Sequence, residues 1–366
     1  MKRGIKGFKR LALLAAAALA LSAALAACGG GSGGNGGGAA ESAGGGDTPA
    51  ANADTGEVYT VRIGCATVLP SHPNWFMEEL KKALEAKTDR FAVELYPANQ
   101  LGANAEMIQG LQNGNVQGVV LPSGLFTSIA PIFNLFAVPG LVPDADTQYE
   151  MLNNTEVGDA IKAEVSKSGV TPLGFLWCPS QEFYLDRKAE SMADLKGLKI
   201  RGTDAKVCQD ELSAYGAAPV VMSSGDVAMG LQQGTLNGLF TDNTFVAPLK
   251  LFEKAKYVVK GLPGVPNSNT VMISNIFLDS LPDDLNALFR ETVDEVREMT
   301  HEYTIGYEAE CYSQIVDGGG TILTPSQAFI DELAEKDAAV RETFKGDNPD
   351  MLELYDMVEA WVAGSR

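Results

Sequence analysis

The chain has 366 residues, and 45% of them are hydrophobic, so it can bury a substantial core and is long enough for two domains. It carries 47 acidic and 28 basic residues, a formal net charge of −19. This charge argues against nucleic acid as a partner, and it means that an anionic ligand must be held by local cations.

The first 27 residues have the form of a secretory signal peptide. Basic residues crowd the first ten positions, and an apolar run from 11 to 27 follows, interrupted only by Ser22. The run ends in Leu25-Ala26-Ala27-Cys28, which looks like a bacterial lipobox, and its thiol would be acylated as the first mature residue. The alternative, a permanent transmembrane helix, is disfavoured because the run is short for a span and rich in alanine.

Residues 28–56 are predicted to be a lipid-anchored, disordered tether, because they are nearly all small or polar and cannot form a core. The signal peptide holds five of the 28 basic residues and no acidic one. The chain from Cys28 on therefore carries 23 basic and 47 acidic residues, a net charge of −24.

The folded part offers little material for a cofactor site. It has two histidines and none of the C-x-x-C, H-E-x-x-H or G-x-G-x-x-G patterns, so we expect no metal, redox or dinucleotide cofactor. Four cysteines follow Cys28: Cys65, Cys178, Cys208 and Cys311. In an exported chain they could pair in three ways or stay free and buried, and the sequence leaves this open.

Short apolar runs alternate with amphipathic stretches from residue 58 on. Pro73 lies in the first turn of one predicted helix, which has Phe76, Leu80 and Leu84 on a single face. The order strand–helix–strand–helix–strand is typical of an α/β unit with a mixed sheet. Its predicted elements are 58–64, 73–87, 91–96, 105–112 and 116–121.

The same alternation repeats in a second unit. Strands are predicted at 170–177, 198–201, 219–222 and 239–241. Helices are predicted at 205–215, at 225–233 with Ser223 or Ser224 as its cap, and around 248–254.

The last part of the chain predicts a return to the first unit and a long helix. Thr270–Asn275 reads as a strand, and Pro282 opens a helical pattern that continues past Glu308. A helix of roughly 30 residues spans about 45 Å and could bridge two lobes. Apolar residues at helical spacing in the tail are expected to be core residues: Met351, Leu354, Val358 and Trp361.

Two motifs stand out, D-L-K-G-L-K-I-R at 194–201 and L-Q-Q-G-T-L-N-G at 231–238. Their order and spacing, with shorter matches, resemble the solute-binding subunits of TRAP (tripartite ATP-independent periplasmic) transporters, the dicarboxylate-binding-protein-like family. The resemblance runs from about Tyr59 to the C-terminus. The shorter matches are Leu69–Pro73, Gln100–Gly102, Leu111–Val116, Phe252–Tyr257 and Leu281–Leu285.

The resemblance implies an α/β, bilobed, periplasmic-binding-protein-like fold, with two mixed-sheet lobes joined by hinge strands and a long connector helix. We expect lobe I at 57–178 plus 267–305, and lobe II at 179–266 plus 306–366. Arg201 falls on the family's characteristic ligand-binding arginine, and its planar fork can hold a carboxylate by two parallel hydrogen bonds. The alternative is an arginine that pairs with a neighbouring acid to join two elements.

The sequence also departs from the family. The position of a second arginine found in many members counts to Gln181, which can hydrogen-bond a ligand but has no charge. The segment Asn237–Thr241 stands where the family frequently has a D-G-x-E-N loop, and it lacks the acidic residue of that loop. The segment Ser223–Asp226 stands where the family usually has an aromatic residue followed by Ser and Glu. These departures favour a monocarboxylate or a polar keto or hydroxy acid over a tightly held dicarboxylate.

Further candidate ligand-binding residues follow from their places at predicted strand ends, where open α/β sheets bind ligands. His72 could instead cap the following helix, and the two large aromatic residues could be core. Asp242 would be unfavourable beside a carboxylate. The candidates are His72 and Ser123 in the first lobe, and Trp177, Gln181, Thr241, Asn243 and Phe245 at the second.

The sequence thus predicts an extracytoplasmic, lipid-anchored protein that captures a small organic acid by hinge closure and delivers it to a TRAP membrane permease. One alternative is a sensor module of the same fold that delivers its ligand to a receptor. Another is an exported enzyme, which the absence of a paired acid–base or nucleophile constellation disfavours.

Overall fold

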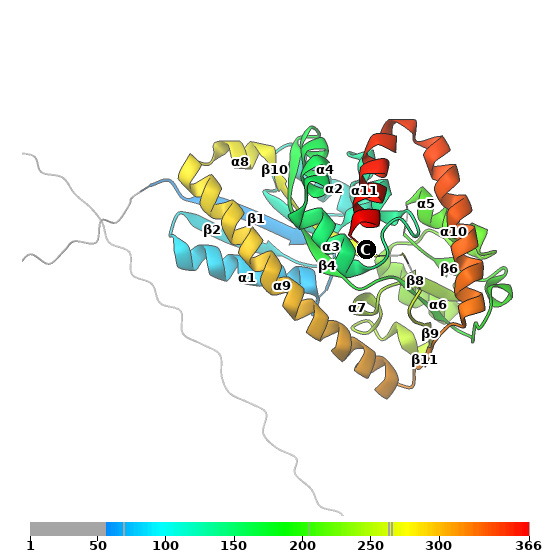
Figure 1. The fold of residues 1–366 in the computed structure, drawn as a ribbon. Coiled ribbons are helices and arrows are strands. Elements are labelled where there is room, and N and C mark those ends of the chain that lie inside the picture. The colour runs from blue at the N-terminus through cyan, green and yellow to red at the C-terminus, as the bar shows by residue number, and fades with distance from the viewer. Residues whose placement is uncertain (1–55, 69, 204, 263, 265, 366) are drawn as a thin grey trace, which may run out of the picture. The chain divides into compact units, whose positions relative to one another are not determined.

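The computed structural model describes residues 56–365 apart from Leu69, Asp204, Pro263 and Val265 (Figure 1). The signal peptide, Cys28 and nearly all of the predicted tether lie outside the described residues. Among the helices that are described, none is long and apolar enough to cross a membrane.

The first sheet has five strands in the order β2-β1-β3-β10-β4. The strands β1, β2 and β3 run parallel, and β10 runs antiparallel to both β3 and β4. The sheet is therefore mixed. Its strands are β1 (Tyr59–Cys65), β2 (Phe91–Tyr96), β3 (Gly118–Pro122), β4 (Val170–Cys178) and β10 (Asn267–Ser274). The helices that precede or follow them are α1 (His72–Lys87), α2 (Asn104–Gln112), α3 (Ala145–Asn154), α4 (Glu156–Ser166) and α8 (Asn275–Ser280).

The second sheet has six strands in the order β11-β9-β5-β8-β6-β7, and only β5 runs against its neighbours. Its strands are β5 (Glu182–Leu185), β6 (Lys199–Arg201), β7 (Ala218–Val220), β8 (Gly238–Thr241), β9 (Tyr257–Val259) and β11 (Thr321–Leu323). Its helices are α5 (Lys206–Ala214), α6 (Val227–Gln233), α7 (Asn243–Val246) and α10 (Gln327–Asp347), and the last helix, α11 (Leu352–Gly364), packs on α4.

A single helix joins the cores of both sheets. Helix α9 (Asp283–Asp317) has 35 residues and runs past α1 and β4 to α7 and β11 (Figure 1). Its first half buries Phe289 and Val293 in the core between the first sheet and α1. Its second half buries Cys311 and Ile315 against the second sheet. The predicted bridging helix is confirmed, and so is the bilobed α/β fold class, while the residue boundaries of the two lobes stay a prediction.

Two glycines of the recognised motifs have a conformational role. Gly197 has φ +73° in the turn before β6, and Gly234 has φ +70° and ends α6 as its C-cap. This left-handed backbone region is strained for residues with a Cβ. The motifs therefore set the turns that lead into β6 and β8.

Most of the predicted elements exist, but two predictions are wrong. No helix spans 248–254, because Lys250 has a left-handed backbone (φ +51°) and separates α7 from a 3₁₀ turn at Leu251–Glu253. Neither Ser223 nor Ser224 caps α6, which begins at Val227 after a further 3₁₀ turn, and the Ser223 hydroxyl donates to Asp226 instead. The four cysteines of the described chain are free and buried.

Candidate functional site

Strand direction brings the candidate residues to one edge of each sheet. In the first sheet, β4 runs with β1 and β3 because β10 is antiparallel to both β3 and β4. The carboxyl ends of β1, β3 and β4 and the amino end of β10 therefore share one edge. In the second sheet, the carboxyl ends of β6, β7, β8 and β9 share an edge with the amino end of β5. Ligands of open α/β sheets bind at such edges.

Two short crossings connect these edges, β4 to β5 and β9 to β10. A direct contact also joins them, because the Asn267 amide nitrogen donates to the Asp242 carboxylate over 3.3 Å. We refer to the two edges together as the facing edges. They comprise residues 65–68, 70–72, 122–123, 176–178 and 267–270 of the first sheet and 181–182, 201, 221–222, 241–245 and 260 of the second.

Arg201 is the last residue of β6. Ile200 before it is fully buried, so the alternation of the strand directs Arg201 to the opposite face, where it is half-buried. Its Nε donates to the Met222 carbonyl over 3.3 Å, and its guanidinium carbon lies 5.8 Å from the centre of the Phe245 ring. A backbone acceptor and an aromatic ring thus orient the guanidinium on the second sheet's edge.

Thr241 ends β8, Asp242 and Asn243 follow it, and all three are buried. The Asp242 carboxylate caps α7 by accepting from the backbone nitrogens of Thr244 and Phe245, and burial raises its pKa. Asn243 donates to the backbone carbonyl of Glu308 on α9 over 3.0 Å. The Asp242 carboxylate is therefore engaged by the protein itself.

Ser123 and His72 belong to two separate hydrogen-bond groups on β10. The Ser123 hydroxyl contacts the hydroxyls of Ser268 and Thr270 at 2.7 and 2.8 Å. His72 is the first residue of α1 rather than its cap, and its Nε2 lies 2.7 Å from the Asn269 amide nitrogen. Burial lowers the pKa of His72 to about 3, so the ring is neutral at ordinary pH.

Trp177 and Gln181 line a cavity of about 260 Å³ at the β4–β5 crossing. The Trp177 indole donates to Asp146 over 2.7 Å, so its ring is fixed at the cavity wall rather than enclosed in the main core. Arg201 is not among the residues that line this cavity. They are Pro143, Asp144, Ala145, Asp146, Trp177, Pro179, Ser180, Gln181, Glu182, Lys260, Gly261, Leu262, Glu308 and Tyr312.

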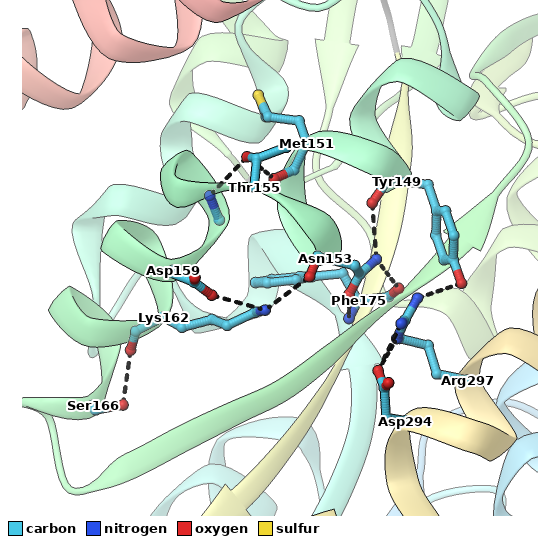
Figure 2. A network of polar contacts seen from close by, with 11 residues as sticks. Tyr149, Met151, Asn153, Thr155, Asp159, Lys162, Ser166, Phe175, Asp294 and Arg297 are labelled. Atoms are coloured by element: carbon cyan, nitrogen blue, oxygen red, sulfur yellow. Dashed lines mark hydrogen bonds and ion pairs between the residues drawn. The ribbon is translucent and has the colours of Figure 1, made fainter. Parts of the chain in front are cut away.

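A polar network fixes the helix that carries one wall of this cavity (Figure 2). The Asn153 side chain of α3 donates to the Phe175 carbonyl of β4 and accepts from its N–H, at 3.0 and 2.9 Å. Arg297 of α9 donates to the Tyr149 hydroxyl and to Asp294. These contacts join α3 to β4 and α9, and so position Asp144 and Asp146 at the cavity.

Several polar residues of the facing edges were not predicted from the sequence. Asn267, Ser268 and Asn269 open β10, and Cys178 ends β4. The signal was present, because the run Asn267-Ser268-Asn269-Thr270 places four polar residues at the start of an otherwise apolar strand. Within the described chain, no group of three His, Cys, Asp or Glu residues could hold a metal ion.

A second, larger cavity of about 520 Å³ lies away from the facing edges. Residues of the 192–196 segment, the end of α5 and α10 line it, among them Tyr215 and Lys336. It contains no candidate residue.

Comparison with known proteins agrees with this architecture. The profile of the family described as bacterial extracellular solute-binding protein, family 7, matches residues 70–347, more than half of the chain. The 2,3-diketo-L-gulonate-binding periplasmic protein YiaO of Escherichia coli is 26% identical over 312 residues, 82% of this chain and 92% of that protein. The C4-dicarboxylate-binding periplasmic protein DctP of Rhodobacter capsulatus is 28% identical over 273 residues, 71% and 76% of the two chains.

The fold has a close counterpart among solved structures. A TRAP periplasmic solute-binding protein from Sulfitobacter sp. NAS-14.1, with bound β-D-galacturonate, superimposes with a TM-score of 0.78 at 19% identity, covering 82% of this chain and 99% of that one. Together with the family match, this means that the chain belongs to the bacterial extracellular solute-binding proteins of family 7, the TRAP type that its motifs resemble.

Proposed function

We propose that this protein captures a small organic acid between its facing edges and delivers it to a TRAP membrane permease. The observation that carries the proposal is the guanidinium of Arg201, oriented by Met222 and Phe245 at the carboxyl edge of the second sheet. The relatives named above are a diketogulonate-binding and a dicarboxylate-binding protein, and the structural neighbour holds a galacturonate. All three ligands are acids.

In this proposal Arg201 holds the carboxylate, because a half-buried guanidinium attracts an anion more strongly than an exposed one. Gln181 is buried and neutral, so it adds a hydrogen bond but no second charge. The proposed ligand-binding set also includes His72, Ser123, Trp177, Thr241, Asn243 and Phe245.

Capture would proceed by hinge closure. The crossings β4–β5 and β9–β10 form the hinge, and α9 spans it. Closure is favoured when the closed form offers the ligand contacts from both edges, and the permease would then recognise that form. We assign lobe I to 57–178 plus 267–305 and lobe II to 179–266 plus 306–366.

We further propose that the protein is held outside the cytoplasmic membrane by acylation of Cys28. A tether of the predicted length would let the folded part reach roughly 30 Å from the bilayer, close to a membrane permease. The relatives named above are binding proteins and not enzymes, which supports a role without catalysis.

The test is a calorimetric titration of the exported, processed protein with succinate, D-glucuronate, D-galacturonate, D-gluconate and L-lactate. At least one acid should bind, and Arg201→Ala should weaken its binding by 100-fold or more, since a charge-assisted pair is lost. Arg187→Ala is the matched control, because Arg187 is an exposed arginine of the same lobe, paired with Asp186. Unchanged binding in Arg201→Ala would refute the proposed site.

The alternative, a sensor module that delivers its ligand to a receptor, predicts a different effect of gene deletion on uptake. Deletion of the gene should abolish uptake of the bound acid if the protein serves a permease, and uptake should persist if the protein serves a receptor. The measurement is uptake of the labelled acid by cells with and without the protein.

A further inference from the structure

A buried polar cluster, made of His72, Asn269 and Cys178, lies at the first sheet's part of the facing edges. The three residues come from the start of α1, the start of β10 and the end of β4. The Asn269 amide nitrogen lies 2.7 Å from His72 Nε2 and 3.0 Å from the Cys178 sulfur. Exposed fractions are 4% for His72, 6% for Asn269 and 1% for Cys178, so bulk water hardly reaches the polar atoms, and each needs another hydrogen-bond partner.

Two polar atoms of this cluster have no hydrogen-bond partner among the residues that the structure describes. They are His72 Nδ1 and Asn269 Oδ1. When the Asn269 N–H donates to Nε2, the neutral ring carries its proton on Nδ1, which leaves one donor on His72 and one acceptor on Asn269. If the amide is turned around, the two roles exchange. Either way the cluster retains one donor and one acceptor.

The opposite edge contributes a third atom of this kind. Asn243 Oδ1, after β8, is also buried without a partner in the described chain, although its amide nitrogen is bound to Glu308. Asn267 and Asp242 join the two edges directly. The three residues that carry the unpartnered atoms thus belong to the facing edges, as Arg201 does. An unmade hydrogen bond at a buried site is costly, which favours a ligand that supplies the missing groups.

The chemistry of the cluster selects among ligand groups. A carboxylate only accepts, so it would leave the acceptor unpaired and be repelled by it. An ammonium only donates, so it would leave the donor unpaired. A hydroxyl both donates and accepts, and adjacent hydroxyls of a polyol do so at two points.

We propose that His72 and Asn269 form a subsite for hydroxyl groups, so that the ligand is a hydroxylated acid, with Arg201 on its carboxylate and this pair on its hydroxyls. This inference rests on the proposed acid-binding function and narrows it to one substrate class. Cys178 holds the Asn269 amide in place.

The experiment compares acids that differ in their hydroxyls. D-gluconate is titrated against hexanoate, and L-lactate against propionate, with succinate and D-glucuronate added, using the processed full-length protein. At least one hydroxylated acid should bind 10-fold or more tightly than its unsubstituted counterpart. His72→Phe and Asn269→Leu should reduce that preference by about 10- to 100-fold, because each removes a buried hydrogen-bonding group.

His72→Gln, which keeps a neutral donor and acceptor, should retain part of the preference. Ser274→Ala is the matched control, since Ser274 is also a buried, unpartnered polar residue of β10 but lies at the strand's opposite end. Circular dichroism melting checks that each variant is folded. If the two cluster variants do not fold, the preference of the unaltered protein still decides.

The outcomes separate the two proposals. Equal or tighter binding of succinate, hexanoate or propionate would overturn the hydroxyl subsite while the acid-binding function stands. An undiminished preference in folded His72→Phe and Asn269→Leu would do the same. Binding of none of these acids would overturn both.

Discussion

At the scale of single residues, the setting of Arg201 explains why its position carries so much of the site. A guanidinium that donates to a backbone carbonyl and lies over an aromatic ring has few orientations left. The Asp242 carboxylate, which also belongs to the second sheet's part of the facing edges, caps α7. The fixed orientation of its guanidinium is what makes Arg201 the proposed anchor for a carboxylate.

Replacing Arg201 by lysine should separate charge from geometry. Lysine retains the positive charge but loses the planar fork, so acid binding should weaken about 10- to 100-fold without loss of folding. Titration calorimetry measures the affinity, and Arg187→Lys should leave it unchanged. Full affinity in Arg201→Lys would show that a point charge is sufficient and that bidentate binding is not used.

Glu182 is a second residue whose environment has a measurable consequence, a dependence of stability on pH. It is the first residue of β5, 5% exposed, and its two carboxylate oxygens accept from the hydroxyls of Tyr312 and Tyr184. Lys260 and Glu308 also face it. Burial raises the pKa of this carboxyl to about 7, so the ionised form is disfavoured in the folded protein.

The folded protein therefore binds more protons at Glu182 than the unfolded chain does between about pH 4.5 and 7, and this residue's contribution to stability falls as the pH rises through that window. Glu182→Gln should leave stability nearly unchanged at pH 5 and raise the free energy of unfolding by about 1–3 kcal/mol at pH 8. Urea unfolding at the two pH values measures the difference. Glu335→Gln, at an exposed glutamate, is the control and should change the free energy of unfolding by less than about 0.5 kcal/mol. A destabilised Glu182→Gln at pH 8 would contradict the assignment.

At the scale of elements, length alone does not decide which segments the sequence predicts. The short strands β6, β7 and β8 are predicted, whereas the helices α3, α4 and α10 are not. Strand β2 and helix α9 follow from clear periodicity, whereas β5, β9 and β11 have three or four residues each and show no pattern of their own. The helix predicted at 248–254 fails because one left-handed residue, Lys250, has no sequence signature. Likewise a motif points to Arg201, but the contact of His72 with Asn269 joins residues 197 positions apart and only the fold reveals it.

The attachment of α10 to α5 rests on one buried tyrosine. The Tyr215 hydroxyl contacts Glu211 of α5 and Asp337 of α10, and all three residues are at least 96% buried. Burial raises the pKa of Asp337 to about 6 and that of Glu211 as well. The Tyr215 hydroxyl therefore links two buried carboxyl groups, donating its one proton to one of them and accepting from the other when that one is protonated.

Removing that hydroxyl should weaken the attachment. Tyr215→Phe removes the buried hydroxyl that both carboxyl groups contact, so the free energy of unfolding should fall by about 1–3 kcal/mol. Tyr96→Phe is the control, because the Tyr96 hydroxyl bonds Glu94 at the surface, and it should change stability by less than about 0.5 kcal/mol. Chemical denaturation at pH 7 distinguishes them. Equal small effects would mean that α10 is held by its apolar face alone.

At the scale of the whole molecule, the four cysteines provide a test of how completely the folded part buries its thiols. Cys65, Cys178, Cys208 and Cys311 are buried and free, and burial raises the pKa of each thiol. In a Cys28→Ser variant, Ellman's reagent should therefore react with no thiol in the native protein and with four after unfolding. Reducing agent should leave the melting temperature unchanged. A reductant-sensitive melting temperature would show a disulfide instead.

Inert native thiols also make the hinge accessible to spectroscopy. Val68 and Val221 are 46% and 57% exposed and follow the carboxyl ends of β1 and β7, one on each of the facing edges. Nitroxide labels at Val68→Cys and Val221→Cys, in the Cys28→Ser background, should report a shorter mean distance when a bound acid is added, because a ligand that contacts both edges favours the closed form. Electron–electron double resonance measures that distance.

Labels at Val68 and Ile276, both attached to the first sheet, should show no change. Arg201→Ala should abolish the shift at the same acid concentration. An unchanged Val68–Val221 distance at saturation would mean that capture occurs without closure, and that a permease would have to distinguish the loaded protein by the ligand itself.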